Sequence, residues 1–161
     1  STQIALMHKG ELLLGVSHAP MFGPAGAMAY AEKGKGAFLN DKPIKASDIA
    51  EMRDATLSLG NIKTLSASDK WPVIAELIQA TTRIRGYGDL YHYHLLAAGK
   101  VDMVVESDVN ILDIAALSVI VHEAGGRMTE MDGGALTLDT TTVVASNGHF
   151  QSAVLERLAP S

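Results

Sequence analysis

The chain has 161 residues, of which 47% are hydrophobic, with a net charge of -5 and no cysteine. That length can bury a sizeable core in one domain, and a negative charge without a lysine or arginine cluster argues against nucleic acid or an anionic membrane as a partner. The lack of cysteine excludes disulfides and thiolate metal sites and is consistent with a reducing cytoplasm, where we expect the protein to be. No apolar run approaches the roughly 20 residues of a membrane span.

The first third of the sequence has the pattern of short strands joined by tight turns. Apolar runs flank His8-Lys9-Gly10, and two prolines and two glycines between His18 and Gly26 indicate a loop. The lysine–glycine alternation at 33–36 lacks the spacing of a phosphate-binding P-loop, so it is interpreted as a hairpin turn. We therefore expect strands at 3–7, 11–17, 27–32 and 37–39, followed by another turn that Asn40-Asp41 and Pro43 make before Ile44.

The remainder alternates between strand and helix patterns. Residues 70–80 and the segment from Asp89 to Gly99 have helical spacing, whereas 60–69 is polar and serine-rich and is expected to be a mobile loop. Further strands are expected at 55–59, 81–85, 101–105, 127–131 and 141–145, with a last helix at about 148–158. Because strands that alternate with helices form a covered sheet, we predict a single α/β domain over 1–161, with a mixed sheet and helices on both faces.

The stretch from Glu106 to Gly126 is the most informative part of the sequence. Residues 114–124 are almost all apolar or small, which indicates a buried helix that Asp113 begins. On local grounds Asp113 is a helix N-cap. However, Glu106 ends the apolar run 101–105, so both carboxylates would project at a strand-to-helix crossover, where α/β sheets bind ligands. Carboxylates at that place, without cysteine, suit Mg²⁺ better than zinc.

Other polar residues give weaker signals. His92 and His94 have a spacing that could bind metal from a strand, but on the helix predicted here they would point apart, so packing or a surface position is favoured. Asp89 follows Gly86-Tyr87-Gly88 at a helix start, and it is either a cap or part of a site. We find no serine-nucleophile motif.

Several motifs together resemble the inositol monophosphatase family. They are L-D-I-A-A at 112–116, E-A-G-G at 123–126, R-x-R-G-Y-G-D at 83–89, L-L-A-A-G-K-V-D at 95–102 and E-K-G-K-G-A-F-L-N-D at 32–41. The arginine motif followed by tyrosine-glycine-aspartate is most similar to the histidinol-phosphate phosphatase branch. Leu112 departs from the pattern, because the family usually has tryptophan at that position.

The resemblance implies the C-terminal half of an α-β-α-β-α layered fold and a Mg²⁺-dependent phosphomonoesterase with a small phosphorylated substrate. Histidinol phosphate is the first candidate and inositol 1-phosphate the alternative. Asp113 would help to hold the metal. Glu106 would contact a hydroxyl or ammonium group of the substrate, and Gly88, Asp89 and Leu90 would border it.

The chain also departs from the family in its extent. The glutamate pair and the D-P-I-D-G-T motif, which hold most of the metal and phosphate in the family, are not in this sequence. We therefore expect the C-terminal part of such an enzyme, inactive alone. The alternative is a non-catalytic α/β fragment that serves as a dimerisation domain. We also expect a homodimer, because the opening apolar strand of the isolated chain, stripped of its neighbours, would self-associate.

Overall fold

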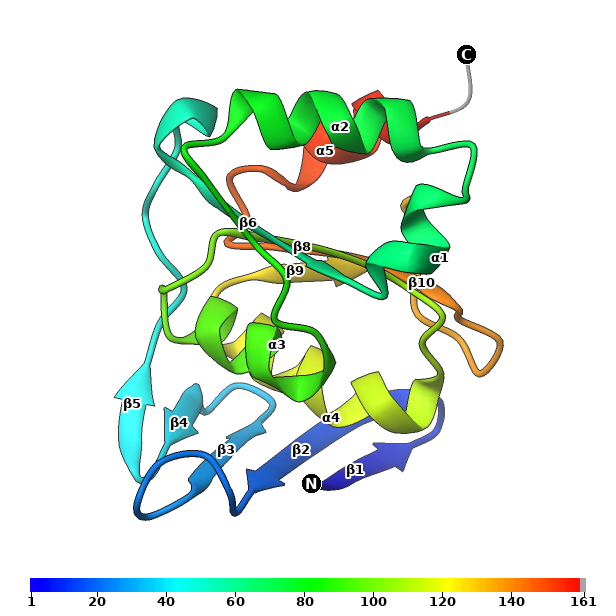
Figure 1. Cartoon of the computed structure of the whole chain (residues 1–161). Helices are drawn as coiled ribbons and strands as arrows, with labels where there is room; N and C mark the ends of the chain where they lie inside the picture. The colour runs from blue at the N-terminus through cyan, green and yellow to red at the C-terminus, as the bar shows by residue number, and fades with distance from the viewer. Residues whose placement is uncertain (160–161) are drawn as a thin grey trace.

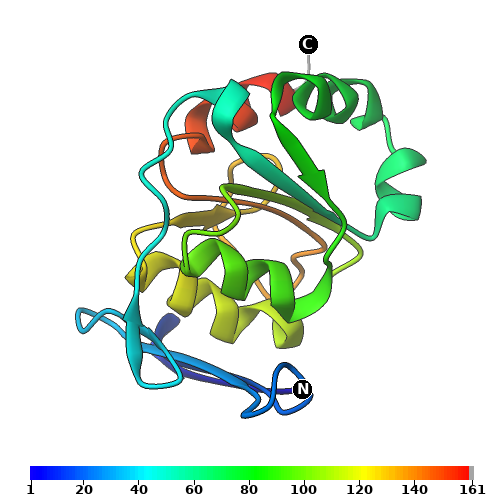
Figure 2. The ribbon, with the colours of Figure 1, turned by 60° about the vertical axis from the view of Figure 1, so that its left-hand side comes forward.

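The computed structural model describes residues 1–159, which form alternating layers of helices and sheets (Figures 1 and 2). Strands of the first part of the chain make an antiparallel sheet, in which each strand pairs with the next along the sequence. They are β1 (Thr2–His8), β2 (Glu11–Ala19), β3 (Ala27–Glu32), β4 (Ala37–Leu39) and β5 (Lys42–Ile44). This sheet forms one outer layer of the molecule.

The later strands make a mixed sheet with the order β7-β6-β8-β10-β9. Strand β6 is parallel to β7 and to β8, whereas β10 is antiparallel to both of its neighbours. The strands are β6 (Thr56–Gly60), β7 (Arg83–Arg85), β8 (Met103–Ser107), β9 (Arg127–Thr129) and β10 (Thr142–Ser146). The carboxyl ends of β6, β7 and β8 therefore lie at one edge of the sheet.

Helices cover both faces of the mixed sheet. The helices are α1 (Ile62–Ser66), α2 (Trp71–Ala80), α3 (Asp89–Ala97), α4 (Ile111–Glu123) and α5 (Gln151–Leu158), with a short 3₁₀ turn η1 (Met52–Asp54). One apolar core joins α1, α2 and α5 to the outer face of the mixed sheet. Helices α3 and α4 lie between the two sheets, as Figure 2 shows. The described residues thus form four layers in the order helix, sheet, helix, sheet.

The antiparallel sheet approaches α4 closely because its inner face carries small residues. Ala29 and Ala31 of β3 are fully buried against Val119 and Ile120 of α4. At Gly15 of β2, a Cβ atom would lie only 2.2 Å from the carbonyl oxygen of Ala116. Only glycine fits there, so this residue sets the distance between sheet and helix.

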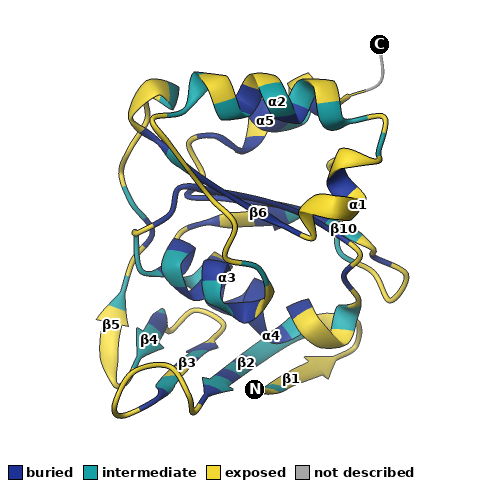
Figure 3. Ribbon diagram, viewed as in Figure 1, coloured by how far each residue is buried: buried dark blue, intermediate teal, exposed yellow. Residues whose placement is uncertain are grey.

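The opposite face of the antiparallel sheet carries larger apolar side chains that no described element covers. Figure 3 shows that most of β1 is exposed and much of β2 only partly buried. These apolar side chains surround a hollow of about 550 Å³ whose apolar lining includes Leu14, Val16, Met28, Tyr30 and Phe38. On the edge strand β1, Ile4 and Leu6 are more than half exposed. This face has the composition of a surface that another layer covers.

The predicted α/β class, with a mixed sheet and helices on both faces, is confirmed. Three local predictions were wrong. The expected mobile loop at 60–69 contains α1, because Leu65 is almost completely buried and anchors a short helix after Asn61. Residues 42–44 form an edge strand despite Pro43. Helix α4 begins at Ile111 with Asn110 as its N-cap, so Asp113 is not the cap.

None of the helices in the described residues is long and apolar enough to cross a membrane.

The buried His94 predicts a pH dependence of stability. Its Nε2 lies 2.7 Å from Ser17 Oγ of β2, and burial lowers its pKa from 6.5 to about 4. Between these values the unfolded chain binds the proton and the folded chain does not, so stability is fully present above pH 6.5 and is lost as pH falls. We expect the free energy of unfolding to drop by about 2 kcal/mol from pH 7 to pH 5.

Urea unfolding at both pH values measures this effect, and His94→Gln is the matched variant because its amide can still bond to Ser17. The variant should have a flatter pH dependence than the wild type. Equal slopes for the two proteins would contradict the assignment to His94.

Candidate functional site

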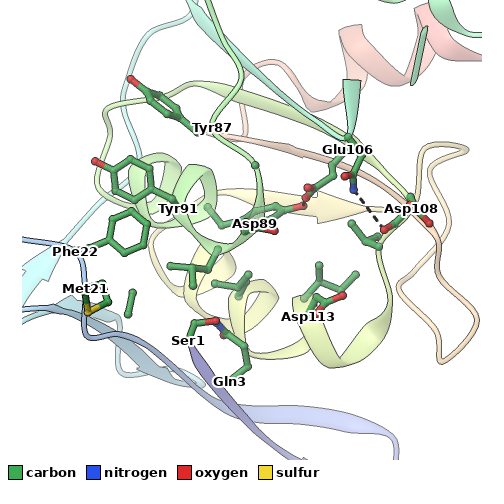
Figure 4. A pocket seen from close by; sticks show the side chains of 18 of the residues that line it. Ser1, Gln3, Met21, Phe22, Tyr87, Asp89, Tyr91, Glu106, Asp108 and Asp113 are labelled. Atoms are coloured by element: carbon green, nitrogen blue, oxygen red, sulfur yellow. Dashed lines mark hydrogen bonds between the residues drawn. The ribbon is translucent and has the colours of Figure 1, made fainter. Parts of the chain in front are cut away.

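A cavity of about 530 Å³ opens where the parallel strands β6, β7 and β8 end (Figure 4). All five residues that the sequence singled out line it, which are Gly88, Asp89, Leu90, Glu106 and Asp113. The crossover expected between Glu106 and Asp113 is therefore present, and it meets the turn that follows β7. This edge of the sheet is the position where open α/β sheets bind ligands.

Three non-glycine residues with positive φ angles line the cavity. Asn61 (φ 50°) directly follows β6, Asp108 (φ 57°) directly follows β8, and Asp89 (φ 49°) begins α3 after β7. Asparagine and aspartate tolerate this conformation better than other residues with side chains. The Asn61 amide donates a hydrogen bond to the carbonyl of Ser107 at 2.6 Å and so ties two of these turns together. These turns and the hydrogen bond between two of them thus fix the backbone around the cavity.

Glu106 lies in β8 with only 3% of its surface exposed, yet it reaches the cavity. The hydroxyl of Tyr93 donates to its Oε2 at 2.6 Å, and His92 Nε2 lies 3.0 Å from the same oxygen. A Cβ atom on Gly60 would lie 2.2 Å from the other carboxylate oxygen. The carboxylate is therefore held on one side by two donors and on the other by a glycine that leaves room for it.

Tyr93 and His92 extend this network. Burial raises the pKa of Tyr93 well above 10, and the nearby charges of Glu106 and Asp113 raise it further, so the phenol stays protonated and donates to Glu106. His92 is fully buried, and its Nδ1 lies 3.3 Å from Ser58 Oγ of β6. His94, two residues later, faces the other sheet. The prediction that the two histidines point apart is confirmed.

Asp113 is the third residue of α4 and lies on the cavity wall opposite this network. Its Oδ2 accepts hydrogen bonds from the Asn110 side chain at 2.6 Å and from the Asn110 backbone at 3.4 Å. Asn110 in turn accepts from the Leu112 amide at 2.9 Å. Among the described residues Oδ1 accepts no hydrogen bond, so one carboxylate oxygen is free for a ligand. Leu112 is 80% exposed and does not line the cavity.

The turn between β7 and α3 supplies the third side of the cavity. Gly88 has φ 66° and is the N-cap of α3, while Asp89 is exposed and Leu90 is buried beneath it. Asp89 therefore begins the helix as expected but does not cap it. Its carboxylate is accessible to a ligand.

The oxygen donors fit a hard cation in type but not in number. Glu106, Asp108 and Asp113 come to the same side of the cavity (Figure 4). However, no three acidic or histidine side chains within residues 1–159 converge closely enough to hold a metal ion. Asp113 can therefore be one ligand of such an ion, whereas the described residues do not complete its coordination.

Several cavity residues were not singled out from the sequence. They include Asn61, Asp108, Tyr93 and an aromatic group of Phe22, Tyr87 and Tyr91. His92 was considered only as a metal ligand or a packing residue. A tyrosine and a histidine adjacent on one helix give no sequence signal that both reach the same buried carboxylate.

The fold and the cavity together define a layered α/β protein with an acid-lined cavity at the carboxyl edge of its parallel strands. The family model described as the inositol monophosphatase family matches residues 1–161. The chain therefore belongs to the inositol monophosphatase family, and the resemblance proposed from its motifs is confirmed.

Curated relatives include phosphatases with different names. The chain is 35% identical over 160 residues to a histidinol-phosphatase from Mycobacterium tuberculosis, covering 96% of this chain and 60% of the relative. It is 32% identical over 157 residues to a fructose-1,6-bisphosphatase/inositol-1-monophosphatase from Thermotoga maritima, covering 97% and 59%. These similar identities show a phosphatase family and do not select a substrate.

Solved structures agree with this assignment. An inositol monophosphatase from Thermotoga maritima matches with a TM-score of 0.83 at 32% identity, covering 97% of this chain and 59% of that one. The extragenic suppressor protein suhB from Bartonella henselae matches with a TM-score of 0.86 at 26% identity, covering 97% and 60%. The chain thus spans about 60% of the length of these relatives.

The contact between Gly60 and Glu106 gives a prediction for this chain. Gly60→Ala should force the Glu106 carboxylate away from Tyr93 and His92 and lower the free energy of unfolding by about 1–3 kcal/mol, the usual cost of overpacking. Chemical denaturation measures the change.

Gly86→Ala is the control, since the nearest atom to its new Cβ would be the end of the exposed Ile62 side chain at 3.1 Å. It should change stability by less than about 0.5 kcal/mol. If Gly60→Ala were as stable as Gly86→Ala, the tight contact with Glu106 would be wrong.

Proposed function

We propose that a full-length enzyme containing this chain hydrolyses a small phosphate monoester with the help of Mg²⁺, and that histidinol phosphate is the substrate. The observation that carries this proposal is the charge of the cavity. Asp89, Glu106, Asp108 and Asp113 line it, and no lysine, arginine or histidine side chain among the described residues does. A phosphate dianion would be repelled here unless cations lie between it and the carboxylates.

The same charge supports the choice of ester. Histidinol phosphate carries an ammonium group and an imidazole, whereas inositol phosphate offers only hydroxyl groups. Glu106 is held in a buried position, where a charge interacts more strongly than in water. Asp89 is exposed at the cavity mouth and adds a second negative charge on the ester side. A positively charged leaving group is therefore favoured over a neutral one.

Each acid has a separate task in this proposal. Asp113, with one free carboxylate oxygen, would be a ligand of Mg²⁺, which when bound polarises the phosphoryl group and lowers the pKa of water. Glu106 binds the ester side of the substrate, and Tyr93 and His92 keep it in place. Gly88 and Leu90 shape the wall next to Asp89.

Inositol 1-phosphate is the second candidate, because relatives named for that substrate are about as similar as those named for histidinol phosphate. We also propose that this chain forms a homodimer, since β1 is an edge strand in the described residues and Ile4 and Leu6 are exposed on it. The cytoplasmic location expected from the lack of cysteine stays a prediction.

The 161-residue chain alone should release no phosphate. Asp113 cannot hold Mg²⁺ without further ligands, and none of the described residues completes the set. The measurement is phosphate release from histidinol phosphate by the purified chain at several Mg²⁺ concentrations, with circular dichroism to establish that it is folded. Saturable, Mg²⁺-dependent hydrolysis by the folded chain would contradict the prediction.

Asp113→Asn in the full-length enzyme tests whether Asp113 binds metal or only stabilises the first turn of α4. The asparagine oxygen can still accept from the Asn110 backbone, so the melting temperature should change little. The charge that binds metal is lost, and we expect kcat to fall at least about a hundredfold.

Asp132→Asn is the matched control, because Asp132 likewise accepts a bond from a nearby backbone amide, that of Gly134 at 2.8 Å, and does not line the cavity. It should leave kcat unchanged. Near-normal turnover in Asp113→Asn would reject the metal role.

A further inference from the structure

We propose that Phe22, Tyr87 and Tyr91 form a subsite that binds a planar, positively charged nitrogen ring on the ester side of the substrate. The inference rests on the proposed phosphatase function and adds the chemical group that the enzyme selects. These three residues come from separate segments. Phe22 lies in the loop between β2 and β3, Tyr87 follows β7, and Tyr91 is in the first turn of α3.

The three rings form a continuous aromatic wall. Phe22 and Tyr91 stack with centroids 4.6 Å apart and an interplanar angle of 24°, and Tyr87 meets Tyr91 edge to face at 5.4 Å and 87°. Both Phe22 (41%) and Tyr87 (43%) keep large exposed fractions although they line a cavity. The wall therefore presents accessible ring surface to whatever enters.

Aromatic residues are concentrated at this cavity. The whole chain has three phenylalanines, four tyrosines and one tryptophan, and four of these eight side chains line it. The fourth, Tyr93, is buried and bonded to Glu106, so its place has a structural reason. Packing alone does not explain why the other rings stay exposed. Exposed apolar surface in a concave site is typical of a binding surface.

The arrangement of charges determines what the wall can bind. Figure 4 shows the rings at one end of the cavity, Glu106, Asp108 and Asp113 at the other, and Asp89 between them. An ester whose phosphate group lies on the Asp113 side of the cavity would extend past Glu106 and Asp89 toward the rings. A planar cation there gains contact with the ring faces and attraction to Asp89. A compact polyol has neither a planar face nor a charge to offer.

An imidazole ring is planar and, with an ordinary pKa of about 6.5, is positively charged once it is protonated, so its protonated form has both properties. A purine base shares the planar nitrogen ring but is neutral, so it tests whether flatness alone is sufficient. The discriminating experiment therefore compares three esters, which are histidinol phosphate, inositol 1-phosphate and adenosine monophosphate. Discrimination is expressed as the ratio of their kcat/KM values.

In the full-length enzyme, Tyr91→Leu should lower kcat/KM for histidinol phosphate about 5- to 30-fold, the range expected for loss of one aromatic contact to a ring or cation. The value for inositol 1-phosphate should change less than about twofold. Tyr91→Phe, which keeps the ring, should retain the discrimination. Tyr30→Leu is the control, because Tyr30 stacks on Phe38 at 5.3 Å on the outer face of the antiparallel sheet, away from this cavity.

A binding measurement on the 161-residue chain makes the subsite testable without activity. Titration with histidinol should shift the NMR signals of the Phe22, Tyr87 and Tyr91 rings, while titration with inositol should not. If these shifts occur but the enzyme hydrolyses only inositol 1-phosphate, the proposed substrate is wrong and the subsite stands. The subsite is wrong, and the proposed function stands, if histidinol phosphate is hydrolysed but Tyr91→Leu lowers kcat/KM equally for both esters. The same holds if histidinol phosphate is hydrolysed but no ring signal shifts.

Discussion

The close packing of α4 against the antiparallel sheet is the constraint on which the rest of the structure depends. Gly15 allows the backbone of β2 to lie directly against the backbone of Ala116. If the helix moved away from the sheet, it would lose a buried face. The same helix packs its other side on α3 and the mixed sheet. Its first turn is thereby fixed between two sheets, and Asp113 is carried to the cavity by packing that lies far from it in the sequence.

Glu106 illustrates how the fold keeps a charge where solvent cannot support it. A buried carboxylate is costly unless donors compensate for the lost water. Tyr93 and His92 supply those donors from α3, and Gly60 supplies space from β6. Strands β6 and β8 and helix α3 must therefore all be correctly placed for the Glu106 carboxylate to reach the cavity. A carboxylate held in this way loses little freedom when a ligand binds, which is the benefit of preorganisation.

Much of the fold could be predicted because long apolar patterns dominate it. The run 114–124 is buried on most sides because it lies between two sheets, and its sequence shows this directly. Short elements were less predictable. Helix α1 has one buried anchor, Leu65, which is too little for a periodic signal. The five predicted residues that line the cavity were singled out through motifs. Phe22, Tyr91 and Asn61 reach the cavity only through tertiary packing, and their spacing in the sequence gives no signal of this.

Under the proposed function, the acidity of the cavity separates the tasks of this chain from those of the rest of the enzyme. Four carboxylates repel phosphate and attract cations, so this part of the protein cannot bind the phosphate group by itself. It can hold one side of a metal ion and recognise the group to which the phosphate is attached. Substrate choice would then reside in residues such as Glu106 and Tyr91, while phosphate binding depends on ligands that these residues do not supply.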